Sequence, residues 1–134
     1  MVMELLLPHA VETDGVTVRV GVSYLPEQSS PEAGRWFWAY HIRIENGRDE
    51  VVQLLNRVWL ITDGRGEKHR VEGEGVIGEQ PVIMPGGAYD YVSGCPLPTP
   101  MGSMVGHYLM VREDGETFPV AIPRFELKAP VALH

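Results

Sequence analysis

Alternation of apolar and polar residues, interrupted by turn residues, is the feature that most constrains what this chain can fold into. Residues 16–24 read Val-Thr-Val-Arg-Val-Gly-Val-Ser-Tyr, so every second side chain is apolar. Such alternation turns one face of a strand toward a core and the other toward water. No segment carries apolar residues at helical spacing for three turns. The pattern therefore predicts an all-β protein.

Further strand-like segments follow at intervals of roughly 10 to 15 residues, with turn residues between them. We expect these strands over residues 36–46, 51–63, 68–72, 88–93, 101–112 and 117–122. Residues 51–63 are apolar on both faces, which is typical of a central strand between two covering layers. Asn46-Gly47 predicts a hairpin turn. The whole pattern indicates an antiparallel two-sheet β-sandwich of about seven to eight strands.

The length of the chain limits the number of domains, and its charge balance limits the classes of ligand that it can bind. With 134 residues, the chain is predicted to form a single domain, with its core over residues 10–127 and a tail over residues 128–134. The 18 acidic residues outnumber the 11 basic ones, and no run of Lys or Arg occurs. Nucleic-acid binders present basic surfaces. DNA and RNA are therefore not expected as main ligands.

The compartment is predicted from cysteine usage and from the first residues. Cys95 is the single cysteine, so an internal disulfide cannot form. The apolar run Leu5-Leu6-Leu7 is too short for a signal sequence or a membrane span, and Glu4 stands where export requires basic residues. We expect a cytoplasmic protein that does not insert into a membrane.

The one motif-like spacing is Gly73-x-Gly75-x-x-Gly78, which matches the glycine pattern of dinucleotide-binding units. In those units the glycines lead from a strand into a helix whose N-terminus holds pyrophosphate. Here Pro81 and Pro85 follow, and no segment long enough for a helix intervenes. The segment is therefore predicted to be a glycine-rich crossover between strands.

Catalytic arrangements are not evident. Ser93-Gly94-Cys95-Pro96 contains a thiol, but no helix start or neighbouring base is present to activate it. A buried, structural Cys95 is the better interpretation. We expect no enzymatic activity.

Metal-ligand spacing is equally absent, because the histidines are scattered singly. Glu72 and Glu74 would share one face of a strand, and Glu79 could approach from the crossover. Three carboxylates would suit Mg²⁺, for which Co²⁺ could compete. A solvated acidic strand edge produces the same pattern. We expect no cofactor, with a Mg²⁺ or Co²⁺ site as the alternative.

The sequence resembles the ApaG family over almost its whole length. The residues that carry this resemblance are Tyr24, Gln28-Ser29, Phe37, Ala39-Tyr40, Gln53-Leu54-Leu55, Arg57, Trp59, Ile61-Thr62-Asp63, Gly73, Gly75-Val76, Gly78-Glu79-Gln80-Pro81, Ser93-Gly94, Gly106 and Tyr108. The resemblance implies a fold similar to fibronectin type III and immunoglobulin-like sandwiches. It also implies a bacterial protein associated with cobalt resistance and magnesium efflux. ApaG-like domains of eukaryotic F-box proteins look like partner-binding modules, and the family has no established catalytic residues to transfer.

The function expected from the sequence is a non-catalytic module that binds a protein partner, with an indirect role in Co²⁺ and Mg²⁺ homeostasis. Irregular loops on a rigid scaffold are where recognition concentrates. The expected contact residues lie in the proline-rich loop and in the crossover: Gln28, Ser29, Trp36, Gly73, Gly75, Gly78, Glu79 and Gln80. A homodimer through an edge strand is a further option. The alternative function is a sensor that binds divalent metal or phosphate and nucleotide compounds through the acidic glycine-rich segment.

Overall fold

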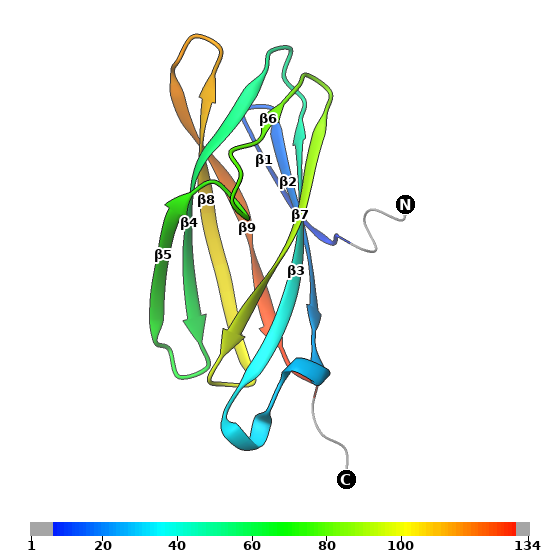
Figure 1. The fold of residues 1–134 in the computed structure, drawn as a ribbon, viewed down its shortest axis with the longest axis vertical. Helices are drawn as coiled ribbons and strands as arrows, with labels where there is room; N and C mark the ends of the chain where they lie inside the picture. Colours follow the sequence, from blue (N-terminus) through cyan, green and yellow to red (C-terminus); the bar gives the residue numbers. More distant parts are fainter. Residues whose placement is uncertain (1–6, 131–134) are drawn as a thin grey trace.

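The computed structural model describes residues 7–130, which form two antiparallel sheets packed face to face (Figure 1). Along the chain its elements are β1 (His9–Thr13), β2 (Val16–Tyr24), the 3₁₀ turns η1 (Pro26–Gln28) and η2 (Pro31–Ala33), β3 (Trp36–Asn46), β4 (Val52–Asp63), β5 (Lys68–Glu74), β6 (Val82–Ile83), β7 (Ala88–Leu97), β8 (Met101–Arg112) and β9 (Thr117–Lys128). The all-β, two-sheet antiparallel sandwich expected from alternation is confirmed.

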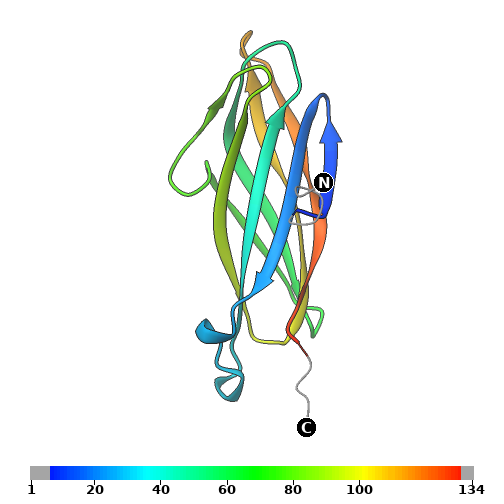
Figure 2. The same ribbon diagram turned by 90° about the vertical axis from the view of Figure 1, so that its right-hand side faces the viewer.

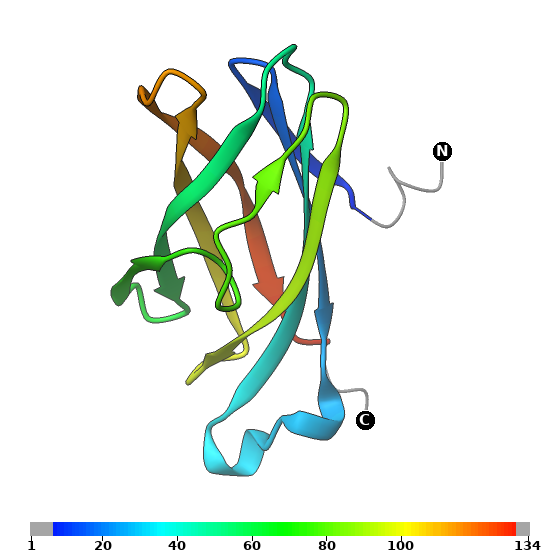
Figure 3. The same ribbon diagram turned by 45° about the horizontal axis from the view of Figure 1, so that its top comes forward.

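Each sheet has its own strand order. The first sheet runs β1-β2-β3-β7, and Figure 2 shows it face on. The second runs β5-β4-β8-β9, with the short β6 pairing to β4 beyond the end of β5. As a result, β5 and β7 are the unpaired outer strands on one side of the sandwich, and β1 and β9 are those on the other side (Figure 3).

The β1 and β9 side is closed. The amide N–H of Ala121 in β9 donates to the hydroxyl oxygen of Thr13 in β1 at 3.1 Å. The rings of His9 in β1 and Phe125 in β9 lie 6.2 Å apart. The fully buried large side chains between the sheets include Trp38, Ile42, Ile44, Leu54, Met104, Tyr108, Met110, Ile122, Phe125 and Leu127. These contacts stabilise the pairing of the two sheets by removing apolar surface from water.

A β-bulge explains why residues 51–63 are apolar on both faces. The register of β4 against β8 shifts between Leu54 and Asn56. Val52 and Leu54 are buried before the shift, whereas Trp59 and Asp63 are buried after it. The extra residue moves the inward face from even to odd positions. Leu60 on the outer face is 36% exposed, so the expectation of two covering layers is wrong.

The predicted hairpin at Asn46-Gly47 is also wrong, because β3 and β4 belong to different sheets. Asn46 is buried, and its Nδ2 donates to the carbonyl oxygens of Glu50 and Ile83, both at 2.9 Å. Its Oδ1 accepts the amide N–H of Arg48 at 3.0 Å. The side chain thus fastens the chain where it passes from one sheet to the other.

Several strands and strand boundaries differ from the sequence expectation. β1 and β6 were not expected, and β7 continues to Leu97 instead of ending at Ser93. β7 tolerates Pro96 because only one of its edges is paired, with β3. The expected tail over 128–134 begins inside β9, and residues 131–134 lie outside the described part. Among the described residues no helix is long and apolar enough to cross a membrane.

The hydrogen bonds of Asn46 generate a stability prediction. Asn46→Ala removes all three side-chain bonds and takes the donor from the buried Ile83 carbonyl and the partly buried Glu50 carbonyl, where an unsatisfied buried group costs about 1–3 kcal/mol. We expect its free energy of unfolding to fall by roughly 2–4 kcal/mol in urea titrations. Asn56→Ala, at an exposed position of β4, is the control and should change stability by less than about 0.5 kcal/mol. Equal effects in both variants would contradict this role for Asn46.

Candidate functional site: a groove between the sheets

The side chains between β5 and β7 leave a groove, because within residues 7–130 no strand closes this side of the sandwich. Its larger part has a volume of about 480 Å³, and a second part of about 290 Å³ adjoins it. Both parts are lined by Tyr40, Arg57, Trp59 and Ser93. We call the whole the intersheet groove, the larger part its apolar part and the smaller one its inner pocket.

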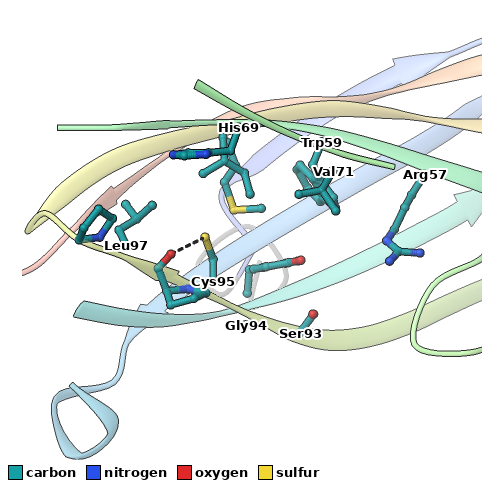
Figure 4. A pocket seen from close by; sticks show the side chains of 13 residues that line it. Arg57, Trp59, His69, Val71, Ser93, Gly94, Cys95 and Leu97 are labelled. Atoms are coloured by element: carbon teal, nitrogen blue, oxygen red, sulfur yellow. Dashed lines mark hydrogen bonds between the residues drawn. The ribbon is translucent and has the colours of Figure 1, made fainter. Parts of the chain in front are cut away.

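The apolar part is built by inward positions of β4, β5 and β7 (Figure 4). Trp59 lies opposite Val71, and Ile61 lies opposite His69, in the register of β4 against β5. Residues 93–98 form the facing wall. Val71 remains 39% exposed although it faces the other sheet. Partly exposed apolar side chains in a concave surface are typical of a binding site.

The inner pocket carries hydroxyl groups and one cation. Tyr40 comes from β3, Tyr91 and Ser93 from β7, and Arg57 from β4. The hydroxyl groups of Tyr91 and Tyr108 lie 2.6 Å apart and join the two sheets. Burial raises the pKa of Tyr40, Tyr91 and Tyr108 above its ordinary value. Phenols are already protonated at neutral pH, and the upward shifts keep these three in that form; one hydrogen of the Tyr91–Tyr108 pair is used in their mutual bond.

The glycine motif shapes this pocket. Gly73 lies opposite Arg57 in the strand register, and a Cβ there would lie 2.8 Å from the Arg57 Nη1 atom. Gly75 has a φ of +63°, and a Cβ there would collide with the carbonyl oxygen of Glu79. Gly78 has a φ of +81° and lines the inner pocket. The three glycines therefore make room for Arg57 and form a tight turn, which explains their spacing without a nucleotide.

This tight turn forms one wall of the inner pocket. The amide N–H of Val76 donates to the Glu79 carbonyl at 2.8 Å, and that of Glu79 donates to the Val76 carbonyl at 3.0 Å. Ile77 and Gly78 between them both have positive φ, as in a type I′ turn. A β-branched residue with φ of 44° is strained, yet Ile77 is 57% exposed at the pocket. Strain of this kind concentrates at functional sites.

The proline-rich loop lies elsewhere. η1 and η2 form one end of the sandwich, whereas the crossover lies along its side between the sheets (Figures 1 and 3). The Ser29 hydroxyl donates to the Leu25 carbonyl at 2.8 Å and accepts the Phe37 amide at 3.0 Å, so it stabilises the loop. Trp36 is partly buried against the core, and Gln28 is exposed. The structure does not bring these residues to the crossover.

Two predicted crossover residues make intramolecular contacts. The side-chain amide of Gln80 donates to the Leu55 carbonyl at 3.0 Å. The Glu79 carboxylate accepts the Tyr89 hydroxyl at 2.9 Å. Both side chains hold the crossover against neighbouring strands.

The structure also separates the three predicted metal-binding carboxylates. Glu72 pairs with Arg70 at 3.1 Å on the outer face of β5, and this bond lowers the pKa of Glu72. Glu79 is engaged with Tyr89. Among the described residues, the group whose ligand atoms lie within 4.8 Å of one another is Asp63, Glu67 and His69. These residues lie at the β4–β5 hairpin, and His69 also lines the apolar part of the groove.

Cys95 lines the groove without the environment of a nucleophile. Its side chain is 3% exposed, and burial raises the pKa of the thiol to about 11. The thiol contacts the Pro96 carbonyl oxygen at 3.7 Å, drawn as the dashed line in Figure 4. His69 lines the same part of the groove. Within residues 7–130, however, no hydrogen bond joins it to Cys95. A protonated, buried thiol does not act as a nucleophile.

Sequence reasoning missed the inner pocket and the Asp63 group. One available signal was Arg57, an arginine two residues before Trp59 and therefore on its face of the strand. Another was the placement of Asp63, Glu67 and His69 around a hairpin turn. The contribution of Tyr91 and Ser93 had no local signal, because they reach the pocket from the other sheet.

Comparisons with known proteins agree with the fold. The ApaG domain pattern matches residues 26–112. Protein ApaG of Afipia carboxidovorans is 55% identical over 118 residues, which cover 88% of this chain and 91% of that protein. Protein ApaG of Maricaulis maris is 54% identical and covers 89% of this chain and 92% of its own length. The crystal structure of the ApaA protein from Bordetella pertussis has a TM-score of 0.84 at 42% identity, covering 93% of this chain and 100% of that one. The chain therefore belongs to the ApaG domain family.

Proposed function

We propose that this protein is a non-catalytic binding module that holds an extended segment of a partner protein in the intersheet groove. The observation that supports the proposal is the unclosed side of the sandwich between β5 and β7. Each wall of this groove ends in a strand, β5 or β7, whose outer backbone groups have no neighbouring strand in the described part of the chain. An extended peptide matches such a surface because it can use backbone hydrogen bonds and place alternate side chains inward.

The groove's lining favours a peptide over a catalytic role. Its apolar part offers aromatic and aliphatic contacts, with Trp59 and Val71 on one wall and Leu97 on the other. Aromatic side chains in a partly enclosed pocket are typical anchors of protein interfaces. Cys95 is held as a protonated, buried thiol. This proposal keeps the crossover as part of the binding surface and leaves the η1–η2 loop outside it.

A divalent-cation site is the second candidate function, and Asp63 is the observation that favours it. Asp63 is 4% exposed, and its Oδ2 atom has no hydrogen-bond partner within the described structure. Its Oδ1 accepts the amide N–H groups of Arg65 and Glu67. Two carboxylates with one imidazole suit borderline metals such as Co²⁺ better than Mg²⁺, which prefers oxygen ligands. A site of this kind would relate the module to cation homeostasis directly.

The groove proposal predicts opposite outcomes for two exposed valines on the outer strands. Peptides are selected from a displayed random library on the purified protein, and their affinities are measured by fluorescence anisotropy. Val71→Glu places a charge inside the apolar part and should weaken binding about tenfold or more, since a buried unpaired charge is costly. Val92→Glu is the control, because Val92 is 60% exposed and does not line either part of the groove. Equal losses in both variants, or no selectable peptide, would contradict the proposal.

The strain at Ile77 predicts that relieving it makes the protein more stable but weakens its binding of peptides. Asn adopts positive φ more readily than a β-branched residue, so Ile77→Asn should raise the free energy of unfolding by about 1 kcal/mol. The same change removes an exposed apolar contact at the inner pocket. We therefore expect the selected peptides to bind several-fold more weakly to a more stable protein. Unchanged affinity would show that Ile77 does not contact the ligand.

The cation candidate predicts that ligation depends on the hairpin and not on the outer face of β5. Glu67→Gln and His69→Gln should each lower Co²⁺ affinity by about tenfold or more in calorimetric titrations, because each removes one ligand. Glu72→Gln and Glu74→Gln are matched controls on the same strand and should leave the affinity unchanged. Loss in the Glu72 and Glu74 variants alone would favour the acidic-edge site instead. Absence of saturable binding by the unaltered protein would contradict both sites.

A further inference from the structure

The cation of the inner pocket is held in place without a counter-ion. The Arg57 Nη1 atom donates to the carbonyl oxygens of Glu74 at 3.1 Å and Gly75 at 2.9 Å. No carboxylate oxygen of the described residues lies within 4.0 Å of the Arg57 nitrogens. Arg43 and Arg70, on outward faces, each pair with a carboxylate. Arg57 lines both parts of the groove, and its remaining N–H donors have no carboxylate acceptor among the described residues.

The surroundings of Arg57 fix its position. Nη1 occupies the space opposite Gly73, where a Cβ would lie 2.8 Å away. Two backbone carbonyls orient the guanidinium from one side. Tyr108 lies directly opposite Arg57 on β8 in the strand register. A fixed guanidinium loses little conformational entropy when a ligand binds, and its planar donors match a carboxylate.

Hydroxyl donors complete the arrangement. Tyr40 and Ser93 line the inner pocket together with Arg57, and they come from the opposite sheet. The Tyr40 phenol is protonated at neutral pH and can donate, and burial raises its pKa further above the ordinary value. A cation beside neutral O–H donors in a partly enclosed site is suited to an oxyanion, because hydrogen bonds to an ionised acceptor are stronger than neutral ones.

We propose that the inner pocket binds a carboxylate of the partner peptide, with Arg57 as its ion-pair partner and Tyr40 and Ser93 as hydroxyl donors. This inference rests on the proposed peptide-binding function and specifies the ligand as an acidic peptide. An isolated carboxylate fits better than a polyphosphate, because Arg57 is the one cationic side chain among the described residues that line the inner pocket. Apolar residues of the peptide would occupy the apolar part beside it.

The decisive test uses small probes, so that it does not depend on finding the natural partner. N-acetylglutamate and its uncharged analogue N-acetylglutaminamide are titrated into the ¹⁵N-labelled protein, and the Arg57 Nε–Hε resonance is followed by NMR. We expect a saturable shift with the acid and none with the amide. Inorganic phosphate and pyrophosphate are the competing probes. Saturation by pyrophosphate with no response to the carboxylate would overturn the proposal in favour of a phosphoryl ligand.

Variants assign the effect to individual donors. Arg57→Lys keeps the positive charge but loses the planar set of N–H donors. Tyr40→Phe keeps the aromatic ring but loses the hydroxyl group. Each variant should bind N-acetylglutamate several-fold more weakly. For these variants binding is read from the backbone amides of Gly78 and Ser93. Arg70→Met, on the outer face of β5, is the control and should bind as the unaltered protein does. Retained affinity in Arg57→Lys and Tyr40→Phe, with melting temperatures preserved, would overturn the proposal.

A charge scan of the selected peptides separates this inference from the function on which it rests. Each Glu or Asp of a peptide is replaced by Gln or Asn, and one replacement should lower affinity about tenfold in the unaltered protein. That replacement should have little further effect in Arg57→Lys. Peptides that need an intact Val71 but no carboxylate would support the groove and contradict the carboxylate site.

Discussion

The one-sided closure of the sandwich is the constraint from which the remaining features follow. β1 and β9 meet on one side, where a β1 hydroxyl accepts a β9 amide and the rings of His9 and Phe125 approach each other. On the other side the sheets end at β5 and β7, and the two parts of the groove lie between them. The hydroxyl pair of Tyr91 and Tyr108 still bridges the sheets at its floor. The groove is thus a gap at the edge of a well-packed core, and its shape is set by that core rather than by a mobile loop.

The glycines of the crossover have a different structural role from the nucleotide binding that their spacing suggests. In a dinucleotide-binding unit the glycines let a backbone approach pyrophosphate. Here Gly73 lets a guanidinium approach the backbone, and Gly75 lets the chain turn back on Glu79. The same absence of a Cβ therefore serves an arginine supplied by β4. A match to the glycine motif without its strand and helix context indicates only that other atoms come close to the backbone. In this structure those atoms belong to Arg57 and Glu79.

Alternation in the sequence predicted most of the architecture, because burial of one strand face is a local property with a period of two residues. Alternation failed to predict features that depend on which strands pair with one another. β1 carries only weak alternation in His-Ala-Val-Glu-Thr and is ordered by pairing with β2. The bulge after Leu54 exchanges the inward and outward faces of β4, so its sequence is apolar at both odd and even positions and resembles that of a strand covered on both faces.

The sequence did not predict the groove for a related reason. Its walls come from strands in different sheets, and sequence periodicity carries no information on which sheet a strand joins. Sequence alternation also did not indicate the intramolecular hydrogen bonds of the loop residues Ser29 and Gln80, whose predicted contact with a partner stays a prediction.

The charge distribution predicts that the proposed recognition of an acidic peptide in this groove would act at short range. The protein carries a formal net charge of -7, so an acidic peptide is repelled at distances where the whole charge acts. That repulsion is screened beyond about 8 Å at physiological ionic strength, whereas a carboxylate inside the inner pocket meets Arg57 directly in a partly desolvated site. Highly acidic segments would be disfavoured throughout, and a segment with one carboxylate among apolar residues would lose little from the repulsion and gain fully from the pocket. The proposed site would therefore select its ligand both by repelling highly acidic segments and by contacts to a segment with a single carboxylate.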